Sequence, residues 1–83
     1  MLKGKDFLDE RKLYLASEKV IKRCENRFSE DLTHEAKMEI ICEECDKMID
    51  ESGKIDTCGV IMYSSDAQNA FDYMYDCAVE SLI

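Results

Sequence analysis

The fold is decided by the segment from residue 6 to residue 28, whose sequence is DFLDERKLYLASEKVIKRCENRF. Apolar side chains recur in it at helical spacing and share one side when each residue turns by about 100° around a helix axis. That stripe consists of Phe7, Leu13, Tyr14, Val20, Ile21, Cys24 and Phe28. The whole chain contains no proline, the residue that most often interrupts helices. We therefore predict one long amphipathic helix over residues 6–28.

Two further helices are predicted after this segment. The first covers about residues 31–52, because Gly53 stands where a helix ends in a left-handed residue. Its apolar stripe is Met38, Ile41, Cys45, Met48 and Ile49. The second covers residues 66–83, and the pattern Ser65-x-x-Gln68 before it fits a capping box. Its stripe is Ala67, Phe71, Met74, Ala78 and Leu82.

Residues 55–63 are ambiguous. Their valine, isoleucine and tyrosine favour a strand, but no other segment looks like a partner strand. A lone strand would leave backbone groups unpaired unless another protomer supplied an edge. We therefore predict a short buried helix that packs Cys58, Ile61 and Met62 inward. The predicted fold is a single all-α domain over residues 1–83, a compact antiparallel bundle of three main helices with a short element at 55–63.

Charge is distributed unevenly along the chain, whose net charge is −8. Residues 1–27 hold eight basic and five acidic side chains, whereas residues 28–83 hold three and fourteen. An acidic protein is repelled by phosphates, so we expect no direct nucleic-acid or membrane binding and favour a basic protein partner. No window approaches the ~20 apolar residues of a membrane span, and the start shows no secretory signal. We expect a cytoplasmic protein.

The carboxylates of two predicted helices line up on one side. Helical rotation brings five of them within an arc of about 80° in the second helix, and three more recur at four-residue spacing in the last one. The eight candidate partner-binding residues are Glu35, Glu39, Glu43, Asp46, Asp50, Asp72, Asp76 and Glu80. Like charges at this spacing destabilise a helix, which favours a surface for a basic partner such as a nucleic-acid-binding protein. The alternative is an ordinary solvated face.

Two leucines of the first helix are left over from its core stripe. Leu8 and Leu15 lie on another side of that helix among lysines. They are candidate contacts of a homodimer, in which an edge at residues 58–63 would also take part. A structural or regulatory homo-oligomer is thus an alternative to the binding of a basic partner.

Cys42-Glu43-Glu44-Cys45 has the two-residue spacing with which zinc sites often begin. The other candidate ligands, His34, Cys24, Cys58 and Cys77, form no second pair of this kind, and the adjacent glutamates disfavour thiolates. Core packing is the favoured role of the cysteines, and a zinc module remains an alternative. The lone His34 and the lack of a phosphate-binding glycine loop predict no catalytic residue and no cofactor.

We therefore expect a non-enzymatic acidic binding protein that inhibits or regulates a basic, nucleic-acid-handling partner. Small acidic helical proteins are frequent among phage inhibitors of host enzymes, and that frequency alone suggests a phage-type inhibitor or nucleic-acid mimic.

Overall fold

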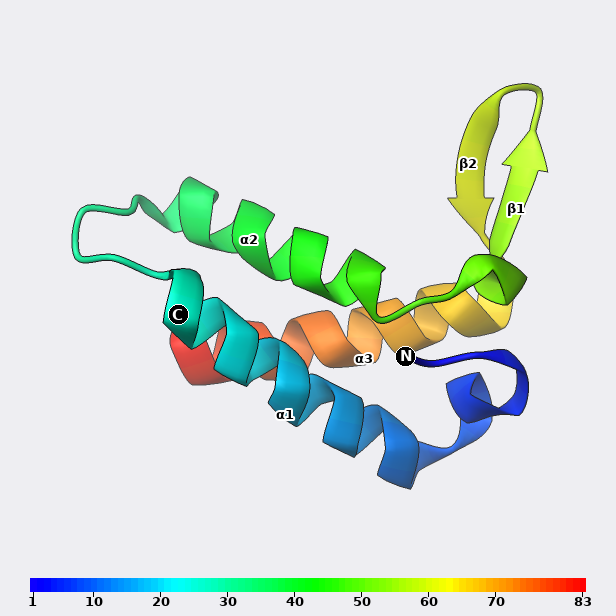
Figure 1. The fold of residues 1–83 in the computed structure, drawn as a ribbon, viewed down its shortest axis with the longest axis horizontal. Coiled ribbons are helices and arrows are strands. Elements are labelled where there is room, and N and C mark those ends of the chain that lie inside the picture. The colour runs from blue at the N-terminus through cyan, green and yellow to red at the C-terminus, as the bar shows by residue number, and fades with distance from the viewer.

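The computed structural model describes residues 1–83 and consists mainly of three packed helices (Figure 1). The helices are α1 (Glu10–Arg27), α2 (His34–Lys47) and α3 (Ser65–Leu82). Two 3₁₀ turns, η1 (Gly4–Leu8) and η2 (Glu51–Gly53), and two strands, β1 (Lys54–Thr57) and β2 (Val60–Tyr63), complete the chain. Figure 1 shows α2 running back along α1 and α3 running back along α2. The fold is therefore mostly helical, but it is not the pure all-α bundle that the sequence predicts.

The first predicted helix, residues 6–28, is interrupted at Asp9. The Asp9 backbone is extended, and its carboxylate accepts hydrogen bonds from the N–H groups of Arg11 (3.0 Å) and Lys12 (3.3 Å). Such a carboxylate satisfies backbone donors that the first turn of a helix leaves unpaired. The segment before it folds into η1, which buries Phe7. Within α1, Tyr14 of the predicted stripe is exposed rather than buried.

The second predicted helix, residues 31–52, is shorter at both ends. The hydroxyl of Thr33 accepts the N–H of Ala36 at 3.1 Å and fixes the start of α2. After α2, Leu2 from the N-terminus forms a parallel bridge with Ile49, and the chain turns into η2. Gly53 has no positive φ and is buried, so the prediction of a left-handed helix end there is wrong.

The third predicted helix is confirmed as α3, which ends at Leu82 as expected. Its cap differs by one residue. The hydroxyl of Ser64, rather than that of Ser65, accepts the N–H of Ala67 at 3.3 Å. Gln68 donates to Asp72 at 3.0 Å instead of closing the predicted capping box. Ser64 can act as the cap because it leaves β2 with extended backbone, whereas Ser65 is already helical.

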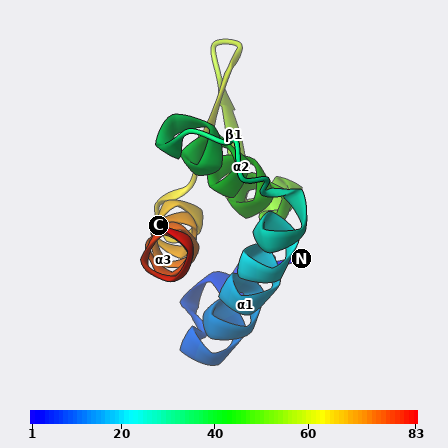
Figure 2. The same cartoon turned by 90° about the vertical axis from the view of Figure 1, so that its left-hand side faces the viewer.

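Residues 54–63 form an antiparallel hairpin, so the prediction of a short buried helix at 55–63 is wrong. The turn consists of Cys58 (φ 52°) and Gly59 (φ 85°), the two positive φ values that a tight two-residue hairpin turn needs. The carboxylate of Asp56 accepts the Gly59 N–H at 3.2 Å. The hairpin extends beyond α2, away from α1 (Figure 2), so Cys58, Ile61 and Met62 are exposed rather than packed inward.

The core lies between the helices and contains fourteen buried apolar residues. Small side chains contribute strongly to it, since four alanines are fully or almost fully buried: Ala16, Ala67, Ala70 and Ala78. Gly53 has no room for a side chain. A Cβ there would lie 2.8 Å from atoms of Phe7, Ile49 and Ala67, so the glycine lets η1, the segment after α2 and the start of α3 meet closely.

Candidate functional site

The five acidic residues that the sequence places on the second helix fall into two groups, three exposed on α2 and two near the hairpin. Glu35 and Glu39 are exposed on α2, and neither forms an ion pair. Glu43 is also exposed, but it binds Arg27 of α1 at 2.8 Å. Part of the predicted stripe is therefore already neutralised by the basic first helix.

The other two members of that stripe have structural roles near the hairpin. Asp46 accepts a hydrogen bond from the hydroxyl of Tyr63 and lies 3.8 Å from the ammonium of Lys54. Burial, followed by this bond to Asp46, raises the pKa of Tyr63. Asp50 lies beyond the end of α2, where it accepts hydrogen bonds from the N–H and hydroxyl of Ser52 and caps η2. Asp46 and Asp50 thus fix the base of the hairpin.

The carboxylates of α3 have no cationic partner. The helix contains four of them, Asp66, Asp72, Asp76 and Glu80, all exposed, and no lysine or arginine. Asp72 accepts the side-chain amide of Gln68, and none of the four forms an ion pair. We call Glu35, Glu39, Asp72, Asp76 and Glu80 the unneutralised carboxylates. They are the exposed members of the predicted set that form no ion pair, and they lie on two helices that pack against each other.

Glu44 forms a buried ion-pair cluster that the sequence reasoning missed. Its side chain is only 4% exposed and lies 3.0 Å from Arg27, 3.5 Å from Lys47 and 3.8 Å from Arg23. A buried carboxylate needs such partners because the loss of hydration is costly. The available signal was the four-residue spacing of Arg23 and Arg27, which places both guanidinium groups on one side of α1. This cluster connects α1 to α2.

The cysteines do not form a metal-binding group. No group of three or more His, Cys, Asp or Glu side chains comes close enough to hold a metal ion, so the structure offers no ligand set for the zinc alternative. Burial, followed by the charge of Glu44, raises the pKa of Cys24 to about 11. Burial likewise raises the pKa of Cys45 to about 12, and Cys42 is exposed but also has a raised pKa because of partial burial and Glu39. Raised pKa values disfavour the thiolates that bind metal or attack substrates.

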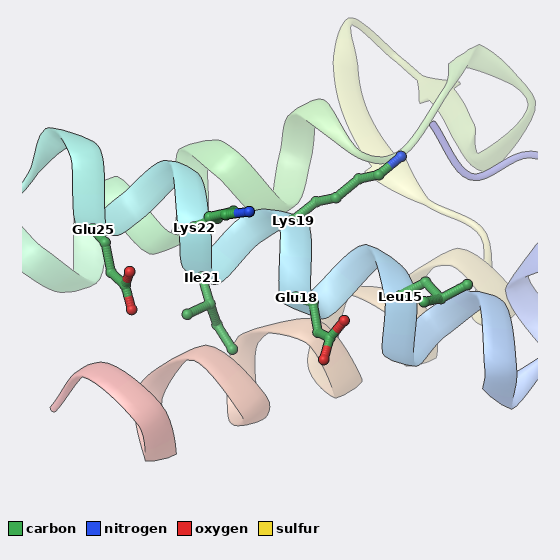
Figure 3. A pocket seen from close by; sticks show the side chains of 6 residues that line it. All are labelled: Leu15, Glu18, Lys19, Ile21, Lys22 and Glu25. Atoms are coloured by element: carbon green, nitrogen blue, oxygen red, sulfur yellow. The ribbon is translucent and has the colours of Figure 1, made fainter.

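Leu8 and Leu15 are exposed, but they lie on different elements. Leu8 is 70% exposed at the end of η1, and Leu15 is 49% exposed on α1. Leu15 lines an open hollow with Glu18, Lys19, Ile21, Lys22 and Glu25. All six side chains come from α1, with Lys19 directed away from α3 and Glu18, Ile21 and Glu25 toward it (Figure 3), so the hollow is a surface of one helix. The role of Leu8 and Leu15 as dimer contacts stays a prediction.

The hairpin exposes a larger apolar surface than the two leucines. Val60, Ile61 and Met62 of β2 are 57% to 62% exposed, and Ile55 of β1 is exposed as well. Only Tyr63, at the base, packs on the helices, with its ring centroid 5.5 Å from that of Phe71. The sequence did contain the β-branched residues, but the expectation that they would be buried hid this surface.

Comparison with protein-family models, curated proteins and solved structures finds no match. None of the helices has the length and apolar character needed to cross a membrane.

Proposed function

We propose that this chain is a non-enzymatic binding protein that inhibits or regulates a basic protein, one that handles nucleic acid, by presenting its unneutralised carboxylates to it. One observation carries the proposal. The eighteen-residue helix α3 holds four exposed carboxylates and no basic residue. A helix that only needed to be soluble would gain from interleaved lysines, because like charges four residues apart destabilise it.

The internal ion pairs support this choice of surface. Two arginines of α1 form ion pairs with α2: Arg27 pairs with Glu43 and Glu44, and Arg23 pairs with Glu44. Lys47 and Lys54 are likewise near Glu44 and Asp46. These four cations are therefore paired within the fold, and Lys37 of α2 lies over the ring of Phe28. The carboxylates of α3 have no ion-pair partner and remain free to attract positive charge. A field of one sign increases the rate at which an oppositely charged partner arrives.

The spacing of the carboxylates fits a partner that normally binds a phosphate backbone. Asp72, Asp76 and Glu80 follow one another at four-residue intervals, which corresponds to about 6 Å along the helix axis. Adjacent phosphates along one nucleic-acid strand are separated by a similar length. A groove lined by Arg and Lys would then meet a row of negative charges in place of a strand.

The experiment compares three double variants of the full chain as bait in affinity capture from the source cells. One reverses the α2 pair (Glu35→Lys, Glu39→Lys), and one reverses the α3 pair (Asp72→Lys, Asp76→Lys). The matched control reverses Glu10 and Glu25 of α1, which are also exposed and without an ion pair. We expect a basic protein that the parent and the control retain and that the α3 variant loses. Equal retention by all four baits would contradict the proposal.

A further inference from the structure

The β1–β2 hairpin is a two-stranded sheet that extends away from the helices (Figures 1 and 2). An isolated pair of strands is marginally stable in water, and independently stable sheets have three or more strands. An exposed apolar edge strand is also a template on which another strand can pair. A further strand could therefore pair with the exposed edge of this hairpin.

The sequence around β2 carries no charge. Residues 57–65, TCGVIMYSS, form the longest uncharged run of a chain in which 36% of residues are charged. This run includes the three most exposed large apolar side chains of the hairpin, Val60, Ile61 and Met62. An uncharged strand gives a basic partner nothing to bind electrostatically. It also brings no like charges into direct contact when two molecules of net charge −8 meet there.

The hydrogen-bond phase of the hairpin shows which backbone groups are free. The Ser64 N–H donates to the Gly53 carbonyl at 2.9 Å, which marks this pair as hydrogen-bonded. In an antiparallel ladder hydrogen-bonded and non-hydrogen-bonded pairs alternate. The register of Ile55 with Met62 and of Thr57 with Val60 continues the bonded pairs. The N–H and C=O groups of Ile61 and Tyr63 consequently point away from β1.

We infer that β2 pairs antiparallel with β2 of a second copy of this chain, with Met62 opposite Met62 of the second copy. In this register Ile61 faces Tyr63 of the second copy, and the reciprocal pair repeats the contact. Each of these two pairs exchanges both backbone hydrogen bonds, so all outward-pointing groups of β2 are used. The contact is symmetric, closes after two copies, and turns two hairpins into one four-stranded sheet.

A hollow beside β2 has the composition that this pairing requires. It is lined by Ile61, Met62, Tyr63, Ser65, Gln68 and Asn69, none of which is charged. The Tyr63 ring is held there by its bond to Asp46 and its contact with Phe71. Ile61 of the second copy would pack on this fixed ring, and pairs of aromatic and β-branched residues across strands are favourable.

The outer edge of β1 is a poorer site for the same contact. The N–H of Lys54 is already bonded to the carbonyl of Glu51. Lys54 and Asp56 also bring charges to that edge, and edge lysines discourage strand pairing. The β2 edge is therefore the one that a second copy occupies.

Sedimentation equilibrium of the full chain tests this dimer. We expect a monomer–dimer equilibrium that Ile61→Lys weakens at least about tenfold, because two ammonium groups then enter uncharged sites. The matched control is Leu8→Lys, which places the same charge on a similarly exposed apolar residue outside the hairpin and should leave the association constant unchanged. A chain that stays monomeric at millimolar concentration would overturn the inference, and so would a dimer that Leu8→Lys dissociates and Ile61→Lys does not.

Cysteine cross-linking tests the register in a background of Cys42→Ser and Cys58→Ser. Opposed residues of a non-hydrogen-bonded pair lie about 4.5 Å apart at Cα, so Met62→Cys should form a disulfide dimer under mild oxidation. Val60→Cys is the control, because the two copies of residue 60 would lie about 14 Å apart along the strands. Equal cross-linking of the two variants would overturn the proposed register. These readouts need no basic partner, so they succeed or fail independently of the proposed function.

Discussion

Replacing Gly53 by alanine is a sharp test of the packing at the base of the hairpin. Gly53 does not have the positive φ that would disfavour a side chain, so the backbone itself accepts alanine. Gly→Ala at such a position normally stabilises a protein by about 0.4–1 kcal/mol, because the unfolded chain loses freedom. The backbone conformation by itself therefore predicts a gain in stability for Gly53→Ala.

The side-chain environment predicts the opposite sign. The new Cβ would lie 2.8 Å from Ala67 Cβ, Ile49 Cγ2 and Phe7 Cζ, which come from α3, the segment after α2, and η1. Overpacking of this kind costs about 1–3 kcal/mol, and simultaneous contact with three segments places Gly53→Ala in the upper half of that range, at about 2–3 kcal/mol. After the entropic gain of about 0.4–1 kcal/mol is subtracted, we expect a net loss of about 1–2.6 kcal/mol in the free energy of unfolding. For a domain of this size that corresponds to a fall in Tm of roughly 4–20 °C.

Urea unfolding followed by circular dichroism measures this loss. The slope of the transition should stay unchanged, since only the stability of the folded state is altered. Ala67→Gly removes one of the three obstructing atoms, so the double variant should lose less than the sum of the two single losses. If Gly53→Ala unfolds at the same or a higher urea concentration than the parent, the close approach of the three segments is not present.

Three further predictions concern the ion-pair cluster, the hairpin turn and the thiols. Arg27→Met should lower the urea midpoint more than Glu44→Gln, because the first leaves a buried carboxylate short of a partner whereas the second leaves cations that remain hydrated. Cys58→Asn should raise the free energy of unfolding by about 0.5–1 kcal/mol, since asparagine before glycine suits this turn; a lower midpoint would contradict the positive φ. Cys24 and Cys45 ionise in the unfolded chain near pH 9.0 but only at about 11 and about 12 when folded. The free energy of unfolding, measured in urea, should therefore keep its full value below pH 9 and fall as the pH rises, by about 1 kcal/mol for each thiol near pH 10. A Cys45→Ala variant should show a smaller fall than the parent over the same pH range.

The helices were predictable because their apolar spacing is regular. The stripe from Ala67 to Leu82 leads directly to α3, and the absence of proline agrees with the helical content. The ends of the helices were harder to predict from the sequence. Asp9 interrupts the first helix because its carboxylate captures two backbone N–H groups, and nothing in the apolar pattern distinguishes that aspartate from its exposed neighbours.

The hairpin was missed for a physical reason. Lys54 and Asp56 lower the strand propensity of β1, so the pattern indicates no partner strand for Val60–Tyr63 within the chain. The Cys58-Gly59 dipeptide forms the hairpin turn, but it predicts such a turn only weakly because cysteine rarely takes a positive φ. The acidic stripe was predictable as a pattern, but the loss of Asp46 and Asp50 to structural roles depends on this unforeseen hairpin.

The central claim is that the unneutralised carboxylates steer a basic partner, and association kinetics test it most directly. Stopped-flow mixing with the captured protein, near 0.1 M and near 1 M salt, compares the parent with the Asp72→Lys, Asp76→Lys variant and the Glu10→Lys, Glu25→Lys control. At the lower salt we expect the α3 variant to associate at least about tenfold more slowly, and the difference should shrink as the Debye length falls from about 10 to 3 Å. The control should match the parent. Association rates that are equal for all three proteins and independent of salt would contradict the claim.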